Sequence, residues 1–257
     1  MSIKESDSEN ETNSNISKDE DEYSEENIDI HELTSNKIEK GIDMSNNNNK
    51  KLYVILEHAN LELSSMKKSI SKLISSEDTK IIKKLGKSKE DYRPDVTHHC
   101  LLSLMDSPLN KAGLLQVFIR TRNNILIEIN PKCRIPRTYN RFEGLFAVLL
   151  KKYRIRAKES SEVLLKVIKN PISDHIPSDC LIVTLNEKSR LVDRDEYAKN
   201  SLKEYKHVCF LVGAISKGDV SVDYTTHDSV SISSYPLSAG VVCGKICDSY
   251  EKAYGVL

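Results

Sequence analysis

Apolar residues in this chain form short runs that alternate with longer amphipathic segments. The short runs are bounded by polar turns, which is typical of buried strands, and the amphipathic segments have helical spacing. Strands are predicted at residues 52–56, 181–185, 207–212 and 229–233, and helices at residues 193–206 and 237–254. This alternation predicts an α/β fold with a mostly parallel sheet.

The middle of the chain carries a β-hairpin signal. Apolar runs at residues 115–119 and 125–129 flank Asn123 and Asn124. Asparagine tolerates the positive φ that a tight turn requires, so these runs are expected to pair as an antiparallel hairpin.

Three further segments have a less regular pattern. Asp95 is expected to cap a helix that ends near Met105. Residues 60–90 are rich in charge and are expected to be mostly helical. Residues 163–168 are apolar and are compatible with a helix or a strand, which should end before Pro171.

The chain divides by composition near residue 50. Residues 1–50 are rich in Asp, Glu, Ser and Asn, and they carry 14 acidic against 5 basic side chains. Such a segment buries too little apolar area to offset its ordering entropy, so it is predicted to be a disordered tail. Residues 51–257 are expected to form one domain; they hold the other 33 basic and 24 acidic side chains, a balance that fits a polyanionic partner.

The six cysteines include no Cys-x-x-Cys pair and no set with zinc spacing, so they are interpreted as reduced core residues. No apolar run approaches the length of a membrane helix, which requires about 18 residues, and neither a membrane partner nor a metal site is expected.

The segment Arg134–Arg141 places three arginines in eight residues. Pro136 favours a stiff loop, and a helix with apolar positions from Phe142 onward is predicted to begin near Thr138. Guanidinium groups beside the N–H groups of a first helical turn form a site for anions such as phosphate. A solvated basic turn with local ion pairs is the alternative, with about equal weight.

Two loops follow predicted strands and contain residues suited to a ligand. Gly213–Gly218 allows close backbone approach after one strand, although it is neither a dinucleotide-binding nor a P-loop motif. Ser233 and Ser234 begin the second loop, in which Pro236 occupies a typical first helical position. Each loop, taken alone, is also compatible with an ordinary turn. Together with the strand end at Leu185, they favour one small-molecule pocket.

Asp95 is close enough to Arg93 to orient its guanidinium, although a helix cap beside a surface arginine is equally compatible. His98, His99 and His175 are interpreted as structural. The sequence identifies no Ser/His/Asp or Cys/His catalytic set.

These segments together resemble the N1-specific pseudouridine methyltransferases of the SPOUT superfamily, a family that modifies small-subunit ribosomal RNA during ribosome biogenesis. The resemblance covers about residues 51–257. It is carried by Arg-Pro-Asp-Val-Thr-His at 93–98, Leu-Met-Asp-Ser-Pro-Leu-Asn-Lys-Ala-Gly at 104–113, Arg-Ile-Pro-Arg-Thr at 134–138, Leu-Lys-Val-Ile-Lys-Asn-Pro-Ile-Ser-Asp-His at 165–175, Leu-Val-Gly-Ala at 211–214 and Ser-Tyr-Pro-Leu-Ser-Ala at 234–239.

The resemblance implies a trefoil-knotted α/β fold, with a β-hairpin insertion, that binds S-adenosylmethionine in the knot. The implied cofactor positions are Leu185, Gly213, Gly218, Ile232, Ser233, Ser234, Tyr235, Pro236 and Leu237. The positions implied to bind RNA are Arg93, Arg134, Arg137 and Arg141, with Asp95 orienting Arg93.

The resemblance also implies partners and a location. The substrate would be a pseudouridine in a small-subunit ribosomal RNA hairpin, and the place of action the nucleolus, beside other ribosome assembly factors. A homodimer would pack through a face that includes Leu237, Val241 and Ile246. The alternative is an assembly factor for which clamping of precursor RNA matters more than methyl transfer.

Overall fold

The computed structural model describes residues 50–64, 72–158 and 160–256. Apart from Lys50, the predicted tail at residues 1–50 lies outside the described residues. The strands are β1 (Lys51–Ala59), β2 (Leu115–Thr121), β3 (Leu126–Ile129), β4 (Arg154–Arg156), β5 (Val163–Ile168), β6 (Cys180–Leu191), β7 (His207–Gly213) and β8 (Asp228–Ser231). The helices are α1 (Thr79–Leu85), η4 (Lys89–Asp91), α2 (Pro94–Met105), α3 (Pro108–Lys111), α4 (Tyr139–Lys152), η5 (Ile172–His175), α5 (Arg194–Glu204) and α6 (Ala239–Tyr254).

The strands form one eight-stranded sheet in the order β4-β5-β3-β2-β1-β7-β6-β8. Neighbours from β2 through β1, β7 and β6 to β8 pair in parallel. The other half, from β2 through β3 and β5 to β4, is antiparallel. The α/β class and the hairpin pairing of β2 with β3 are therefore confirmed, and the apolar segment at 163–168 is a strand.

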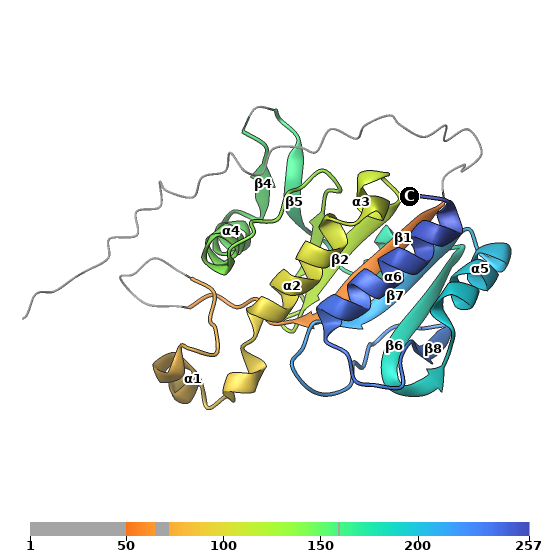
Figure 1. Ribbon diagram of the computed structural model, residues 1–257. Helices are drawn as coiled ribbons and strands as arrows, with labels where there is room; N and C mark the ends of the chain where they lie inside the picture. The colour runs from red at the N-terminus through yellow and green to blue at the C-terminus, as the bar shows by residue number, and fades with distance from the viewer. Residues whose placement is uncertain (1–49, 65–71, 159, 257) are drawn as a thin grey trace, which may run out of the picture.

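The two faces of the sheet are covered differently. Helices α2, α4, α5 and α6 pack on one face, where they share the larger apolar core with alternate residues of β1 and β7 (Figure 1). The opposite face carries a smaller core around Ile55 and Leu211, and it is covered by η5 and by Val222 and Tyr224 of the β7–β8 connection. The β7–β8 connection therefore reaches the face of the sheet opposite α2 and α6.

Helix α4 shows how the local sequence sets an element. Thr138 is its N-cap residue, at the predicted start, and Tyr153 ends it in the left-handed region with φ 61°. The apolar positions that predicted the helix are all buried, namely Phe142, Leu145, Phe146, Leu149 and Leu150. The rings of Phe142 and Phe146, one turn apart on this helix, have centroids 4.4 Å apart in a tilted arrangement, and both are part of the core.

The prediction for residues 60–90 is wrong in most of the part described. Only α1 and η4 are helical, and Leu63 pairs with Leu73 in an isolated antiparallel bridge. Asp78 accepts hydrogen bonds from the Ser75 backbone and hydroxyl, at 2.9 and 3.2 Å. Local side-chain bonds of this kind compete with helix formation.

Two helix starts also differ from the prediction. Arg93, and not Asp95, is the N-cap of α2, because Pro94 takes the first helical position that suits proline. Helix α6 begins at Ala239 with Ser238 as N-cap, so Pro236 lies outside it. The Ser233 hydroxyl accepts a hydrogen bond from the Tyr235 backbone at 3.0 Å, which holds this loop in a turn.

Candidate functional site

A cavity of about 620 Å³ opens beside the middle of β6 and the carboxyl ends of β7 and β8. Parallel strands share a direction, so their carboxyl ends and following loops meet at one edge of the sheet, which is the usual ligand position in such folds. All of the predicted cofactor positions except Ser234 line this cavity: Leu185, Gly213, Gly218, Ile232, Ser233, Tyr235, Pro236 and Leu237. The structure thus brings the two loops and the region of Leu185 to one cavity, as the sequence pattern favoured.

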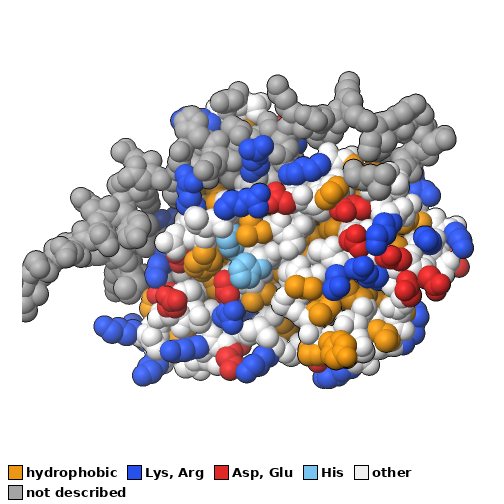
Figure 2. Space-filling model, in the orientation of Figure 1, with side chains coloured by type: hydrophobic (Ala, Val, Ile, Leu, Met, Phe, Trp, Pro, Cys, Tyr) orange, Lys and Arg blue, Asp and Glu red, His pale blue; other side chains and the backbone are white. Residues whose placement is uncertain are grey.

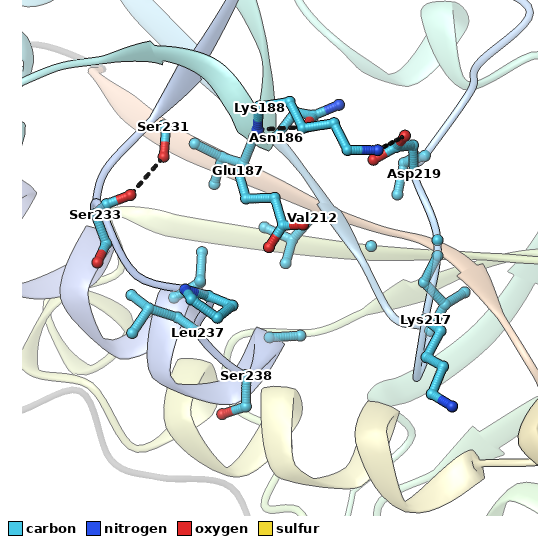
Figure 3. Close-up of a pocket in the computed structure, with 18 of the residues that line it drawn as sticks. Asn186, Glu187, Lys188, Val212, Lys217, Asp219, Ser231, Ser233, Leu237 and Ser238 are labelled. Atoms are coloured by element: carbon cyan, nitrogen blue, oxygen red, sulfur yellow. Dashed lines mark hydrogen bonds and ion pairs between the residues drawn. The ribbon is translucent and has the colours of Figure 1, made fainter.

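One wall of the cavity is a break in β6. Leu185 and Arg190 both pair with Val230 of β8, so residues 186–189 leave the ladder. Asn186, Glu187 and Lys188 then line the cavity (Figure 3). The Asn186 side chain accepts a hydrogen bond from the Lys188 backbone at 2.9 Å, which stabilises the turn. The predicted strand end at Leu185 is therefore the start of this break, and β6 resumes as far as Leu191.

The opposite wall is the loop after β7. An added Cβ at Gly213 would lie 2.5 Å from Val220 Cγ2, so the loop passes too close for a larger residue without movement. Gly218 has φ +101°, a conformation that other residues rarely adopt. Lys188 Nζ and Asp219 Oδ2 meet at 2.7 Å between the two walls (Figure 3).

Helix α2 begins at the cavity with a fixed guanidinium. Arg93 lines the cavity, and its Nε and Nη2 donate to the Asp95 carboxylate at 2.8 and 2.6 Å. Burial alone would raise the pKa of Asp95, but hydrogen bonds and charge from Arg93 outweigh burial and lower that pKa. Asp95 is thus ionised at neutral pH and holds the Arg93 side chain, which is one of the two arrangements that the sequence left open for this pair.

The arginine loop is anchored to the same helix. His98 Nε2 donates to the Pro136 carbonyl at 2.7 Å, and the His98 ring stacks on Phe142 at 4.5 Å. Arg134, Arg137 and Arg141 are exposed, with Arg137 and Arg141 near the N-terminus of α4.

Arg137 reaches the other end of α2, where its Nη1 lies 2.5 Å from Asp106 Oδ2. Since α2 has 12 residues, its ends are roughly 18 Å apart. The basic loop and the cavity therefore lie along one helix. Figure 2 shows Lys and Arg side chains gathered in the upper part of this face, above histidine side chains.

Other chemistry has little support among the described residues. No group of three His, Cys, Asp or Glu side chains is placed to hold a metal ion. All six cysteines are buried and unpaired, and burial raises the pKa of Cys133 to about 12, far from a reactive thiolate. Within the described ranges, no helix is long and apolar enough to span a membrane.

The sequence pattern of the EMG1/NEP1 methyltransferases matches residues 54–251. The chain belongs to the EMG1/NEP1 methyltransferase family. A Homo sapiens protein named ribosomal RNA small subunit methyltransferase NEP1 is 46% identical over 209 residues, which is 81% of this chain and 84% of the relative. The protein of that name in Candida glabrata is 45% identical over 210 residues, or 80% of this chain and 90% of the relative.

A solved structure agrees in fold. Archaeoglobus fulgidus Nep1 bound to S-adenosylhomocysteine superposes with a TM-score of 0.66 at 24% identity, over 80% of this chain and all of that one. The likeness supports the α/β architecture with a mostly parallel sheet flanked by helices.

The sequence pattern did not identify some of the residues that line the cavity of this EMG1/NEP1 family member. Glu187 and Lys188 are part of a strand that was predicted to end earlier, and Val96 of α2 also lines the cavity. The polar run at 186–189 is the one available signal, because it interrupts an apolar strand. Nothing in the sequence pattern indicates that α2 contributes to this pocket.

The anchor between α2 and the arginine loop predicts a pH effect on stability. Burial lowers the pKa of His98, whereas in the unfolded chain it is about 6.5. The unfolded state therefore takes up a proton first, and the free energy of unfolding should fall as the pH drops below about 6.5. His98→Gln keeps a donor for Pro136 but does not titrate.

Urea unfolding at pH 7.5 and 5.5 measures this. Over that range, the free energy of unfolding of the wild type should fall by about 1 kcal/mol more than that of His98→Gln. Equal losses in the two proteins would show that His98 is not the titrating group.

Proposed function

We propose that this protein transfers a methyl group from S-adenosylmethionine to N1 of a pseudouridine in a hairpin loop of small-subunit ribosomal RNA. The observation that carries the proposal is the cavity beside the middle of β6 and the carboxyl ends of β7 and β8, which joins the predicted cofactor positions and has Arg93 at its edge. The names of the relatives support a ribosomal RNA substrate, and the ligand of the archaeal structure supports the cofactor.

The cavity suits such a cofactor in size and chemistry. Its volume lies within the range of about 300–1,000 Å³ usual for small-ligand sites. Leu185, Val212, Val230 and Leu237 offer apolar walls for an adenine ring. Ser231 and the backbone of residues 232, 233, 235 and 236 offer polar groups. Glu187 projects a carboxylate toward the cavity (Figure 3), which suits a cationic sulfonium.

The chain's own groups would act mainly by positioning. When bound, S-adenosylmethionine supplies an electrophilic methyl group on a sulfonium. Pseudouridine is C-linked, so its N1 carries a hydrogen and is not blocked by the sugar. Transfer would break the sulfonium–methyl bond, leave S-adenosylhomocysteine and release the N1 proton to water. Alignment of that nitrogen with the methyl group would supply much of the rate enhancement. The base must leave its stack to enter the cavity, which a hairpin loop allows readily.

The arginines would bind the RNA backbone. Arg93, Arg134, Arg137 and Arg141 suit phosphates, which position an RNA without reading its sequence. Their distribution from the cavity along α2 supports an RNA that crosses this face of the molecule. Asp95 holds Arg93 in one orientation.

Two finer features belong to the same proposal. Family membership supports a SPOUT-type trefoil knot at the cavity. A homodimer is supported by exposed apolar groups beside α6, since Tyr235 is 75% and Val241 is 47% exposed. Ile246 cannot belong to that interface, because it is only 2% exposed within one subunit and packs in the core. Action in the nucleolus, beside other assembly factors, follows from the proposed substrate.

Methyl transfer tests the proposal. Purified protein, labelled S-adenosylmethionine and two matched RNA hairpins are used, with uridine or pseudouridine in the loop. Label should enter only the pseudouridine hairpin, because N1 of uridine is bonded to the sugar. Label in both hairpins, or in a base atom other than N1, would contradict the assigned chemistry.

The arginine loop yields a second prediction. Arg137→Ala should weaken hairpin binding about five- to tenfold and reduce its salt dependence, since one phosphate contact is lost. Its binding of S-adenosylhomocysteine should stay within about twofold of wild type, measured by calorimetry. Arg190→Ala is the matched control, because Arg190 is also exposed and paired with an aspartate, at 2.6 Å, outside this loop. Equal loss of RNA and cofactor binding in Arg137→Ala would refute the assignment.

The second candidate function is that of an assembly factor that clamps precursor RNA. The basic loop favours it, because this loop could bind RNA even if the cavity bound no cofactor. Gly213→Ala separates the two, because a Cβ there meets Val220 and should distort the cavity while leaving the arginine loop intact. If the variant cannot bind S-adenosylmethionine yet still supports small-subunit assembly in cells, clamping is the essential role. Loss of assembly with hairpin binding retained would make methyl transfer essential.

A further inference from the structure

The connection between β7 and β8 touches both the cavity and the far face of the sheet. Residues 214–227 form neither helix nor strand. The first part, 215–220, is a wall of the cavity. The next part crosses to the face opposite α2 and α6, where Val222 and Tyr224 cover the smaller core. The shape of the cavity wall therefore depends on how the second part is held.

A buried carboxyl group lies beneath this connection. Glu57 of β1 is fully buried and pairs in register with Gly213 on the neighbouring strand. The Tyr224 hydroxyl donates to Glu57 Oε1 at 2.6 Å. Among the residues that the structure describes, Glu57 Oε2 has no hydrogen-bond partner, and Arg120 Nη1 lies 4.0 Å from it. Burying a carboxyl group with one unpaired oxygen lowers the stability of the folded state. A contribution to stability therefore does not explain why Glu57 is there.

A second side chain from the sheet grips the same stretch. Arg120 of β2 donates from Nη1 and Nη2 to the two carboxylate oxygens of Asp223, at 2.6 and 2.8 Å. Its guanidinium also lies 5.6 Å from the centre of the Tyr224 ring. At the end of β1, the His58 ring nitrogen Nε2 lies 2.7 Å from the Ser221 carbonyl and donates to it. Three strand residues thus hold Ser221, Asp223 and Tyr224 of the connection.

The side-chain contacts on the cavity side lie at exposed positions, among them a hydrogen bond from Ser216 Oγ to the Glu90 carbonyl at 2.6 Å. Lys217 pairs with Glu90 at 2.9 Å and Lys188 with Asp219 at 2.7 Å, but these side chains are at least half exposed. Exposed ion pairs contribute little to the stability of a conformation. The buried contacts of Tyr224 are therefore the ones that can select a single conformation of the wall.

We propose that Glu57, Tyr224 and Arg120 form a latch that holds the β7–β8 connection in the conformation that binds the cofactor. They are positioning residues, and none of them lines the cavity. The inference depends on the proposed function, since it takes S-adenosylmethionine as the ligand. Without the latch, only a fraction of molecules would have the wall in place, and the apparent dissociation constant would rise by the inverse of that fraction.

Tyr224→Phe tests the latch, because it removes the hydroxyl and leaves the ring packing. The dissociation constant for S-adenosylhomocysteine should rise about five- to tenfold, whereas hairpin affinity should stay within about twofold. In turnover, KM for S-adenosylmethionine should rise by a similar factor and kcat at saturation should be retained, because bound cofactor selects the latched state. Asp223→Asn weakens the Arg120 fork at an exposed position and should give a smaller rise, about two- to threefold.

Two variants serve as controls. Tyr250→Phe also deletes a buried hydroxyl, one that lies 2.9 Å from Ser201 between α5 and α6, and it should leave cofactor affinity unchanged. Glu57→Gln keeps an acceptor for Tyr224 and should stay near wild type, whereas Glu57→Ala should match Tyr224→Phe.

The outcomes separate the latch from the proposed function. Equal effects of Tyr224→Phe and Tyr250→Phe, or a loss of kcat with unchanged KM, would overturn the latch. Failure of the wild type to bind S-adenosylhomocysteine would overturn the proposed function, and the latch with it.

Discussion

The parallel register of β1, β7 and β6 is the constraint on which the candidate site depends. Glu57 pairs with Gly213, and Thr184 with Leu211, so the three strands end near a common edge. A parallel pair cannot be closed by a tight turn, so each strand must leave this edge through a long connection. The cavity is formed by the break in β6, by the segments that follow β7 and β8 and by the start of α2, so its shape depends on the contacts that hold these segments.

Helix α2 connects the cavity to the arginine loop. It packs mainly against α6, where Gly240 brings the helices so close that an added Cβ would lie 3.4 Å from the His99 backbone. Its first turn carries Arg93 to the cavity, and His98 fastens the arginine loop. The spacing between cavity and basic loop is thus set by a rigid element, which suits a substrate that must contact both at once.

The sequence indicates some of this architecture well and some not at all. The α4 helix follows from apolar periodicity and a loop proline, because both are local signals. The break in β6 depends on where β8 pairs, and β8 lies about 40 residues later in the chain. The predicted helix at 60–90 fails where Ser75 and Asp78 bond to each other. Glu57 directly follows an apolar run, yet the residue that buries it, Tyr224, is 167 positions away.

Arg93 links the two halves of the site. Asp95 occupies its Nε and Nη2 donors, while Nη1 makes no hydrogen bond to another of the described residues. A guanidinium that is bound along one edge has lost its rotational freedom before any ligand arrives, so less entropy remains to be lost when a phosphate meets the other edge. At 42% side-chain exposure, Arg93 stays open to that phosphate. Under the proposed function, Asp95 would therefore contribute to RNA binding without touching RNA, just as Glu57 is inferred to contribute to the cavity from beneath its wall.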